Sequence, residues 1–240
     1  MSATNITPDR EVGQIVRDRP TTARVFTEYD IDYCCRGSRT VAEAATTAGV
    51  ELDELREALA AVEPGEDAPQ DWASTDELID HIVAEHHDYL RAELPSLAQL
   101  VTKVRVVHGD AHPELGAVHR TFNALADELL THMRDEEETV FPLIAILAAD
   151  EHLGTDERQL LEEEILHMER DHEEAAANLD RLAELTGDFA IPPGACTRYE
   201  NMLARLAELK TDTHRHVHKE NNVLFRDAAA QLPESEDLTP

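Results

Sequence analysis

Aromatic residues are scarce in this chain of 240 residues, where they make up 4% of the sequence. Hydrophobic residues still reach 42%, so a core has to be built mostly from leucine, valine, isoleucine and alanine. Alanine and leucine favour helices, and no stretch shows the alternation of apolar and polar residues that is typical of a half-buried strand. The composition therefore predicts an all-α protein.

Basic residues are also few, at 21 against 51 acidic residues, which gives a formal net charge of -30. Lysine occurs only at Lys103, Lys210 and Lys219. An acidic surface repels nucleic acid and anionic membranes, so we expect neither as a partner. The charge favours a halophilic cytosolic protein, in which molar salt screens the repulsion to about 3 Å. An ordinary acidic, soluble protein is the alternative.

The sequence also has few cysteines, and we expect neither a signal peptide nor a membrane span. The chain has three cysteines, two of them adjacent, which do not make a disulfide framework. Met1–Val12 lacks the apolar segment of a signal peptide. The longest apolar stretch, Val140–Ala149, is shorter than the about 20 residues that span a bilayer. We therefore expect a cytoplasmic protein without a membrane partner.

The chain reads as two helical domains. Residues 63–74, which include Pro64, Gly65 and Pro69, have the composition of a linker. We expect a small N-terminal helical domain at 1–62, with a capping box at Thr40 and Glu43. Residues 75–240 are expected to form an up-and-down four-helix bundle, because four long apolar patterns are joined by short connections. These four helices are predicted to begin near Thr75, Pro113, Asp156 and Ala195.

One small pattern occurs twice in the predicted bundle. His132 precedes Glu136 by four residues, and His216 precedes Glu220 by the same interval. Residues four apart share one face of a helix. An imidazole combined with a carboxylate is a ligand set that suits iron and other transition metals. The repeated pair thus indicates a metal site inside the bundle.

Helical phase tests these candidates, because a ligand in a bundle core must share the face of the apolar stripe. At about 100° per residue, both His/Glu pairs lie in their stripes, and His172 lies in that of the third helix. On the first helix the stripe contains Ile79, Val83 and His86, with His87 at its edge, so phase slightly prefers His86 and leaves His87 open. Three other histidines face away from the stripes: His167, His214 and His218.

A single histidine on an apolar face is more often a hydrogen-bonded core residue than a ligand. Here two glutamates and at least three histidines share the stripes of one bundle, and burying them without a cation would be costly. Four histidines and two carboxylates without a thiolate fit neither a structural zinc site nor an iron–sulfur cluster. They suit two iron ions. Ferritin-like bundles use Glu-x-x-His instead, so that family is disfavoured.

If both glutamates bridge, each iron receives two imidazoles and two carboxylate oxygens. This leaves room for an oxo or hydroxo bridge and for one open position at each ion. Open positions on iron permit redox chemistry or the binding of O₂ or NO.

These patterns resemble the hemerythrin-like di-iron bundles. With the segment Tyr29–Gly37, which contains Cys34-Cys35, the chain resembles the iron–sulfur cluster repair di-iron proteins, in which a short domain with this signature precedes the bundle. The resemblance extends over nearly the whole chain and includes His87-Asp88 and Glu169-Arg170-Asp171-His172. It implies six metal ligands, with His86 as the alternative to the first: His87, His132, Glu136, His172, His216 and Glu220. Arg36 departs from the glycine that is usual in the family.

The cysteine pair is the second candidate site. Arg36 and the helix start at Thr40 should favour the thiolate form of Cys34 and Cys35. Such thiols could react with NO, form mixed disulfides or pass iron to a client protein. The alternative is that they are two small buried apolar residues. The resemblance favours a functional, catalytic pair.

The resemblance implies repair of iron–sulfur clusters damaged by nitrosative or oxidative stress, through iron donation or NO redox chemistry. Damaged iron–sulfur proteins, NO and O₂ would be the partners, and a homodimer through the first domain is implied. One alternative is a hemerythrin-type carrier or sensor of O₂ or NO, although a simple carrier needs no reactive thiols. Another is an oxidoreductase that consumes NO.

Overall fold

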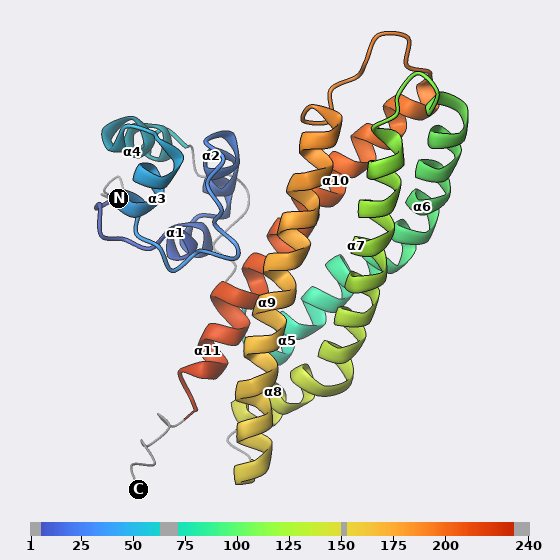
Figure 1. Cartoon of the computed structure of the whole chain (residues 1–240). Coiled ribbons are helices and arrows are strands. Elements are labelled where there is room, and N and C mark those ends of the chain that lie inside the picture. Colours follow the sequence, from blue (N-terminus) through green and yellow to red (C-terminus); the bar gives the residue numbers. More distant parts are fainter. Residues whose placement is uncertain (1–5, 63–71, 150–152, 233–240) are drawn as a thin grey trace, which may run out of the picture. The chain divides into compact units, whose positions relative to one another are not determined.

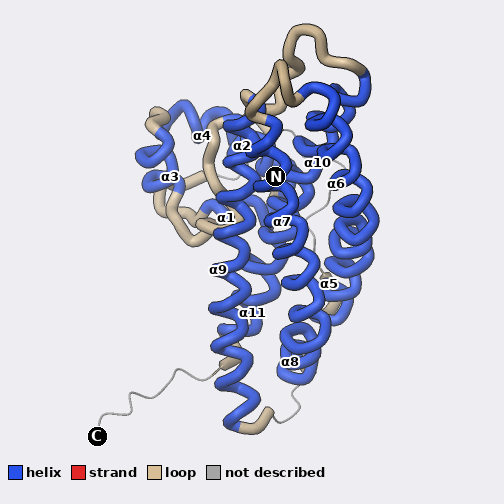
Figure 2. Tube along the Cα trace, turned by 45° about the vertical axis from the view of Figure 1, so that its right-hand side comes forward, coloured by secondary structure: helices blue, strands red, loops and turns tan. Residues whose placement is uncertain are grey.

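A computed structural model of the chain describes residues 6–62, 72–149 and 153–232. Every regular element in these residues is a helix, and the only other pairing is an isolated bridge between Glu11 and Thr40 (Figure 2). The prediction of an all-α protein is confirmed. The chain divides into two compact units, one of residues 1–78 with 217–240 and one of residues 79–216.

The unit of residues 79–216 contains three long helices of the predicted bundle and most of a fourth (Figure 1). These are α6 (Asp88–His108), α7 (Leu115–Asp135), α9 (Thr155–Thr186) and α10 (Thr197–Lys219). Helix α7 packs against both α6 and α9, and α10 contributes Tyr199, Leu206 and Leu209 to the same apolar core. This is the expected up-and-down arrangement of amphipathic helices around one core.

Local signals set the ends of these helices. At the start of α9, Glu157 Oε2 accepts a hydrogen bond of 2.8 Å from the backbone N–H of Gly154. The same helix ends at Gly187, whose φ of 58° lies in the left-handed region that glycine adopts without strain. These two signals therefore set the start and the end of α9.

In the described residues, three π-helical segments interrupt the long helices. They are η2 (Ile82–His87) between α5 (Thr75–His81) and α6, η3 (Glu136–Val140) between α7 and α8 (Phe141–Ala148), and η4 (Glu220–Phe225) between α10 and α11 (Arg226–Ala229). A π turn closes its hydrogen bonds one residue further along than an α turn and is frequent at functional sites. Each segment begins or ends at a predicted ligand.

The π turns shift the phase of the apolar stripes. On the first helix the buried residues are Leu78 and Ile82, whereas Ile79 and Val83, which were predicted to lie in the stripe, are half-buried. The six residues from Ile82 to His87 form one π-helical segment. A uniform 100° per residue cannot describe a helix with such an insertion, so this part of the predicted stripe is wrong by one residue.

The other unit holds the N-terminal helices. These are α1 (Val12–Asp18), the 3₁₀ helix η1 (Pro20–Thr22), α2 (Ala23–Glu28), α3 (Val41–Ala48) and α4 (Leu52–Ala60). The predicted capping box opens α3, since Thr40 and Glu43 exchange hydrogen bonds of 2.9 and 3.2 Å. Val217 belongs to the core of this unit. The chain therefore returns to the N-terminal helices within α10.

The side chain of Asn222 in η4 sits in a tight glycine-lined space within this unit. Asn222 donates a hydrogen bond of 2.8 Å to the carbonyl of Cys34. A Cβ atom placed on Gly13 or Gly37 would lie 2.3 or 2.0 Å from Asn222 Oδ1. Only glycine at these two positions lets the backbone approach the asparagine so closely.

The predicted domain limits of 1–62 and 75–240 stay a prediction, and most of the predicted linker, at 63–71, lies outside the described residues. Among the helices that the structure describes, none combines the length and the apolar character needed to cross a bilayer.

Candidate metal centre

Four predicted ligand histidines form two close pairs. Nε2 of His87, at the end of η2, lies 3.0 Å from Nε2 of His216 in α10. Nε2 of His132 in α7 lies 2.8 Å from Nε2 of His172 in α9. All four rings are buried, with exposed fractions between 0% and 4%. Four elements far apart in sequence thus bring their imidazole nitrogens together inside the bundle.

Glu136 connects the two pairs. Its side chain is fully buried, and its two oxygen atoms face different histidines. Oε2 lies 3.3 Å from His87 Nε2, whereas Oε1 lies 3.2 Å from His132 Nε2. This placement suits a carboxylate that bridges two ions.

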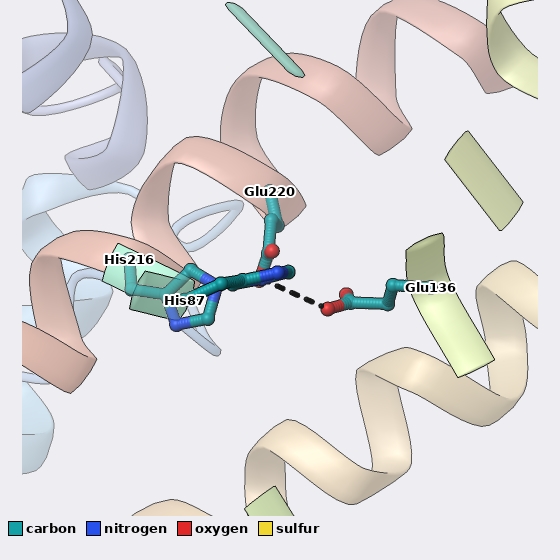
Figure 3. Close-up of side chains that lie close together, drawn as sticks. All are labelled: His87, Glu136, His216 and Glu220. Atoms are coloured by element: carbon teal, nitrogen blue, oxygen red, sulfur yellow. Dashed lines mark hydrogen bonds and ion pairs between the residues drawn. The ribbon is translucent and has the colours of Figure 1, made fainter. Parts of the chain in front are cut away.

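Glu220 follows His216 by one helical turn and completes two overlapping groups of donor atoms. One group consists of His87, Glu136, His216 and Glu220, and the other of His132, Glu136, His172 and Glu220. Within each group all donor atoms lie within 4.8 Å of one another. Figure 3 shows the first group, with the carboxylates of Glu136 and Glu220 directed toward the histidine rings. Two glutamates shared by two histidine pairs is a donor set for two ions.

The distances between neighbouring donor atoms match those between adjacent ligands of one six-coordinate ion. Two nitrogen atoms bound at about 2.1 Å and at right angles stand about 3.0 Å apart. The His87–His216 and His132–His172 separations of 3.0 and 2.8 Å agree with this value. The Glu136–histidine separations of 3.3 and 3.2 Å are close to it.

Charge supports the same conclusion. Glu136 and Glu220 are both fully buried, and burying two carboxylates next to each other requires compensating positive charge. Lone pairs of neutral imidazoles that face each other at 3 Å likewise need a proton or a cation between them. The residues present therefore fit a pair of bound cations.

Two carboxylates hold the outward nitrogens of ligand histidines. His87 Nδ1–H donates to Glu137 Oε1 at 2.6 Å, and His132 Nδ1–H donates to Asp171 Oδ2 at 3.4 Å. Such bonds fix the tautomer that leaves Nε2 free for a metal. Burial alone raises the pKa of Glu137, but hydrogen bonds from His87 and Arg91 outweigh this effect and lower it. The hydrogen bond from His132 lowers the pKa of Asp171.

The choice on the first helix favours His87. His86 is also buried, at 5% exposure, but its Nδ1–H donates to Asp212 at 2.9 Å and its ring stacks on that of His216, with centroids 5.2 Å apart. His86 belongs to neither donor group in the described residues. It packs behind a ligand, whereas His87 places Nε2 among the donor atoms.

The histidines that were predicted to face away lie outside both donor groups. The side chain of His167 is 53% exposed. His218 packs against Tyr33 in the unit of the N-terminal helices, to which both residues belong, with ring centroids 5.8 Å apart. Burial, together with the charge of Lys219, lowers the pKa of His218 to about 4, so this ring is neutral at physiological pH.

A pocket of about 370 Å³ between α7 and α9 opens onto the second histidine pair, since His132 and His172 line it. Five of its other lining residues carry carboxylates: Asp127, Glu128, Asp135, Asp171 and Glu174. Burial and the negative charge of Glu174 raise the pKa of Glu128. The pocket is therefore the acidic, solvent-facing side of the centre.

The cysteine pair lies in the N-terminal unit. Cys34 is 3% exposed and part of the core, and Cys35 is half-buried. The expectation of a thiolate is wrong for Cys34, because its hydrogen bond to Cys35 and its burial raise the pKa of the thiol well above its usual value. Arg36, which was expected to favour the charge, is exposed.

Sequence reasoning missed the supporting carboxylates Glu137, Asp171 and Asp212. Each is adjacent to, or four residues before, a predicted ligand, which is the only available signal among 51 acidic residues. It also missed the π turns that position His87, Glu136 and Glu220. The ligand and cysteine roles stay predictions.

Comparison with known proteins supplies the family. Residues 78–228 match the family model described as the hemerythrin HHE cation binding domain, and residues 8–63 match the domain of unknown function DUF542. The chain is 35% identical over 226 residues to the iron–sulfur cluster repair protein YtfE of Salmonella choleraesuis, covering 92% of this chain and 97% of that protein. It is 34% identical to YtfE of Escherichia coli O1:K1 and of Escherichia fergusonii, with the same coverage. The matched length includes both domain types in the order that the sequence indicated, so the chain belongs to the YtfE family of hemerythrin-like iron–sulfur cluster repair proteins.

Proposed function

We propose that this protein repairs damaged iron–sulfur clusters by donating iron from a di-iron centre held by two histidine pairs and two shared glutamates. The observation that carries the proposal is the pair of overlapping donor groups, each with two histidines of its own and both with Glu136 and Glu220. The hemerythrin HHE match over residues 78–228 supports cation binding, and the names of the relatives support repair.

Some side chains of the proposed centre would bind iron, and others orient the histidines that bind it. The His87/His216 pair and the His132/His172 pair would each hold one iron, and the opposed oxygens of Glu136 bring the two positions together. Glu137 and Asp171 orient their histidines through Nδ1. When bound, a pair of iron ions would supply redox chemistry and open coordination positions.

The acidic pocket supports iron donation rather than tight storage. His132 and His172 face a pocket whose wall carries five carboxylates, and a wall of negative charge raises the local concentration of cations. These carboxylates would bind a cation on its way between the second histidine pair and solvent.

Several finer features belong to the same proposal. Damaged iron–sulfur proteins are the proposed clients, and NO or O₂ the small ligands at open iron positions. We place the protein in the cytoplasm, in a response to nitrosative or oxidative stress. A halophilic host would account for the charge of -30. A homodimer through the N-terminal domain remains a proposal from the family resemblance.

Repair can be tested with an iron–sulfur enzyme that NO has inactivated. The iron-loaded full chain should restore the activity of this enzyme in the presence of a chelator that traps free iron. The iron bound to the chain should decrease in proportion to the amount of enzyme reactivated. Glu136→Gln should lose both bound iron and reactivation, because the neutral amide no longer balances the cations. Reversible O₂ binding without reactivation would contradict repair and indicate a carrier. Catalytic N₂O production without iron loss would indicate an NO reductase.

A further inference from the structure

A second group of metal-ligating side chains lies in the N-terminal unit. Asp32, Cys34 and Cys35 place one donor atom each within 4.8 Å of the others. Cys34 Sγ lies 3.8 Å from Cys35 Sγ and 3.3 Å from Asp32 Oδ1. Neither cysteine forms a disulfide. The pair is therefore held at a distance too long for a disulfide, with a carboxylate beside it.

These separations are those of a tetrahedral metal site. Two sulfur atoms bound at about 2.3 Å with a tetrahedral angle stand about 3.8 Å apart, which the Cys34–Cys35 separation of 3.8 Å reproduces. A sulfur and an oxygen on the same ion stand about 3.6 Å apart, and the Cys34–Asp32 separation is 3.3 Å. The three donors therefore define one face of a tetrahedron.

The backbone around the group is fixed by hydrogen bonds. Asp32 Oδ1 accepts from the backbone N–H groups of Cys34 and Cys35 at 3.0 and 2.9 Å. Asn222 Nδ2 donates to the carbonyl of Cys34 at 2.8 Å. These hydrogen bonds hold the backbone of the donor residues in place, so little conformational entropy has to be lost when an ion binds.

The charge and softness of the donor atoms indicate which cation the site would bind. Two sulfurs and one carboxylate oxygen suit a borderline divalent cation such as Fe²⁺ or Zn²⁺ and disfavour Mg²⁺ or Ca²⁺. Binding forms two metal–sulfur bonds and one metal–oxygen bond and releases the thiol protons of Cys34 and Cys35 to solvent. No electrons are transferred. The cation supplies the positive charge that two adjacent thiolates otherwise lack.

We propose that Asp32, Cys34 and Cys35 form a mononuclear site for a borderline divalent cation, with a fourth position open to an incoming ligand. The site stands on its own geometry. Its use in passing iron to a client rests on the proposed repair function, with a cluster-ligating thiolate of the client as the natural fourth ligand.

Cobalt absorption tests the site in the full chain with its di-iron centre filled and reduced. Tetrahedral Co²⁺ bound by thiolates gives charge-transfer absorption in the near ultraviolet and ligand-field bands in the visible, and the donor set of the bundle contains no thiolate. We expect these bands to saturate at one Co²⁺ per chain, with release of protons. The bands should be lost in Cys34→Ser and in Cys35→Ser.

Two matched variants make the test specific. Asp32→Asn should weaken Co²⁺ binding by about tenfold or more while the loop keeps its conformation, because the amide oxygen still accepts the two backbone hydrogen bonds. Asp30→Asn, on a neighbouring exposed residue, should have no effect, and neither should replacement of the exposed Cys196 by serine. The proposal is overturned if no saturable thiolate band forms, or if the band survives loss of Cys34 or depends on Cys196.

The same variants separate this proposal from the repair function. If Co²⁺ binds as expected but the iron-loaded protein reactivates no damaged enzyme, the repair function fails and the metal site stands. If reactivation proceeds equally in Cys34→Ser, Cys35→Ser and the unaltered chain, iron transfer through the site is excluded.

Discussion

Glu137 and Asp171 hold the rings of His87 and His132 through the nitrogen that faces away from the donor cluster. Neither residue provides a donor atom to the two groups, yet each fixes the tautomer and the direction of a ring that does. The effect of these carboxylates should therefore be visible in metal affinity rather than in folding.

We expect Glu137→Ala to weaken iron binding by about 10- to 100-fold, the usual effect of removing such a partner. Competition with a coloured chelator under anaerobic conditions measures the affinity. Glu138→Ala is the matched control, because Glu138 is the next residue and is exposed. Equal affinity in the two variants would show that the His87–Glu137 bond does not support the site.

Gly37 matters for a steric reason. A Cβ atom there would lie 2.0 Å from Asn222 Oδ1, so Gly37→Ala should lower the free energy of unfolding by about 1–3 kcal/mol, as overpacking does. Urea denaturation measures the change. Gly116→Ala should be neutral or stabilising by up to about 1 kcal/mol, because its Cβ would meet only Arg120, at 3.8 Å. Equal stability of both variants would refute the close approach of Asn222.

At the scale of the helix, the three π segments explain which ligands the sequence could predict. His132 and Glu136 share an α-helical run up to the start of η3, as do His216 and Glu220 up to η4. The four-residue rule therefore found both pairs. His87 is the last residue of a π segment, and helical phase preferred His86. Hydrogen-bond register inside a helix leaves no clear mark on composition, so phase alone could not locate these turns.

Deletion of Ala84, an exposed residue inside η2, tests the role of the π turn. Without the extra residue, Leu78 and Ile82 cannot face the core while His87 faces the donor cluster. We expect the variant to lose bound iron or thermal stability, with helical content by circular dichroism unchanged. Ala84→Gly serves as the control for a change at this position that keeps the length. A deletion variant with full iron content and full stability would contradict a structural need for the π turn.

At the scale of the whole molecule, the net charge of -30 is spread over a chain with 21 basic residues. Self-repulsion of this size destabilises the compact state. The Debye length, over which charges interact, falls from about 10 Å at 0.1 M salt to about 3 Å at 1 M, so added salt weakens the repulsion. The charge should therefore make stability depend on salt.

We expect the melting temperature to rise by several degrees between about 0.1 M and about 1 M KCl, because the Debye length shortens threefold over that range. Chloride is preferable to sulfate, which stabilises proteins by exclusion from their surface. Scanning calorimetry gives the melting temperature. An unchanged or lower melting temperature in KCl would argue against the expectation of a halophilic protein.

The sequence predicted the helical class, the bundle and the two kinds of domain because these depend on apolar periodicity and on short local motifs. It could not predict that residues from Val217 onward pack with the N-terminal helices. That contact depends on Asn222, Gly13 and Gly37, which are distant in sequence and carry no shared pattern. The raised pKa of Cys34 was missed for the same reason, since burial is a property of the fold.

The central claim is a di-iron centre with Glu136 and Glu220 shared between two histidine pairs. Its most direct test is the iron content of the full chain after anaerobic reconstitution and removal of loosely bound metal, measured together with the absorption spectrum of the oxidised protein. We expect two iron ions per chain and the charge-transfer bands of an oxo- or hydroxo-bridged pair. One iron or fewer per chain, without those bands, would contradict it.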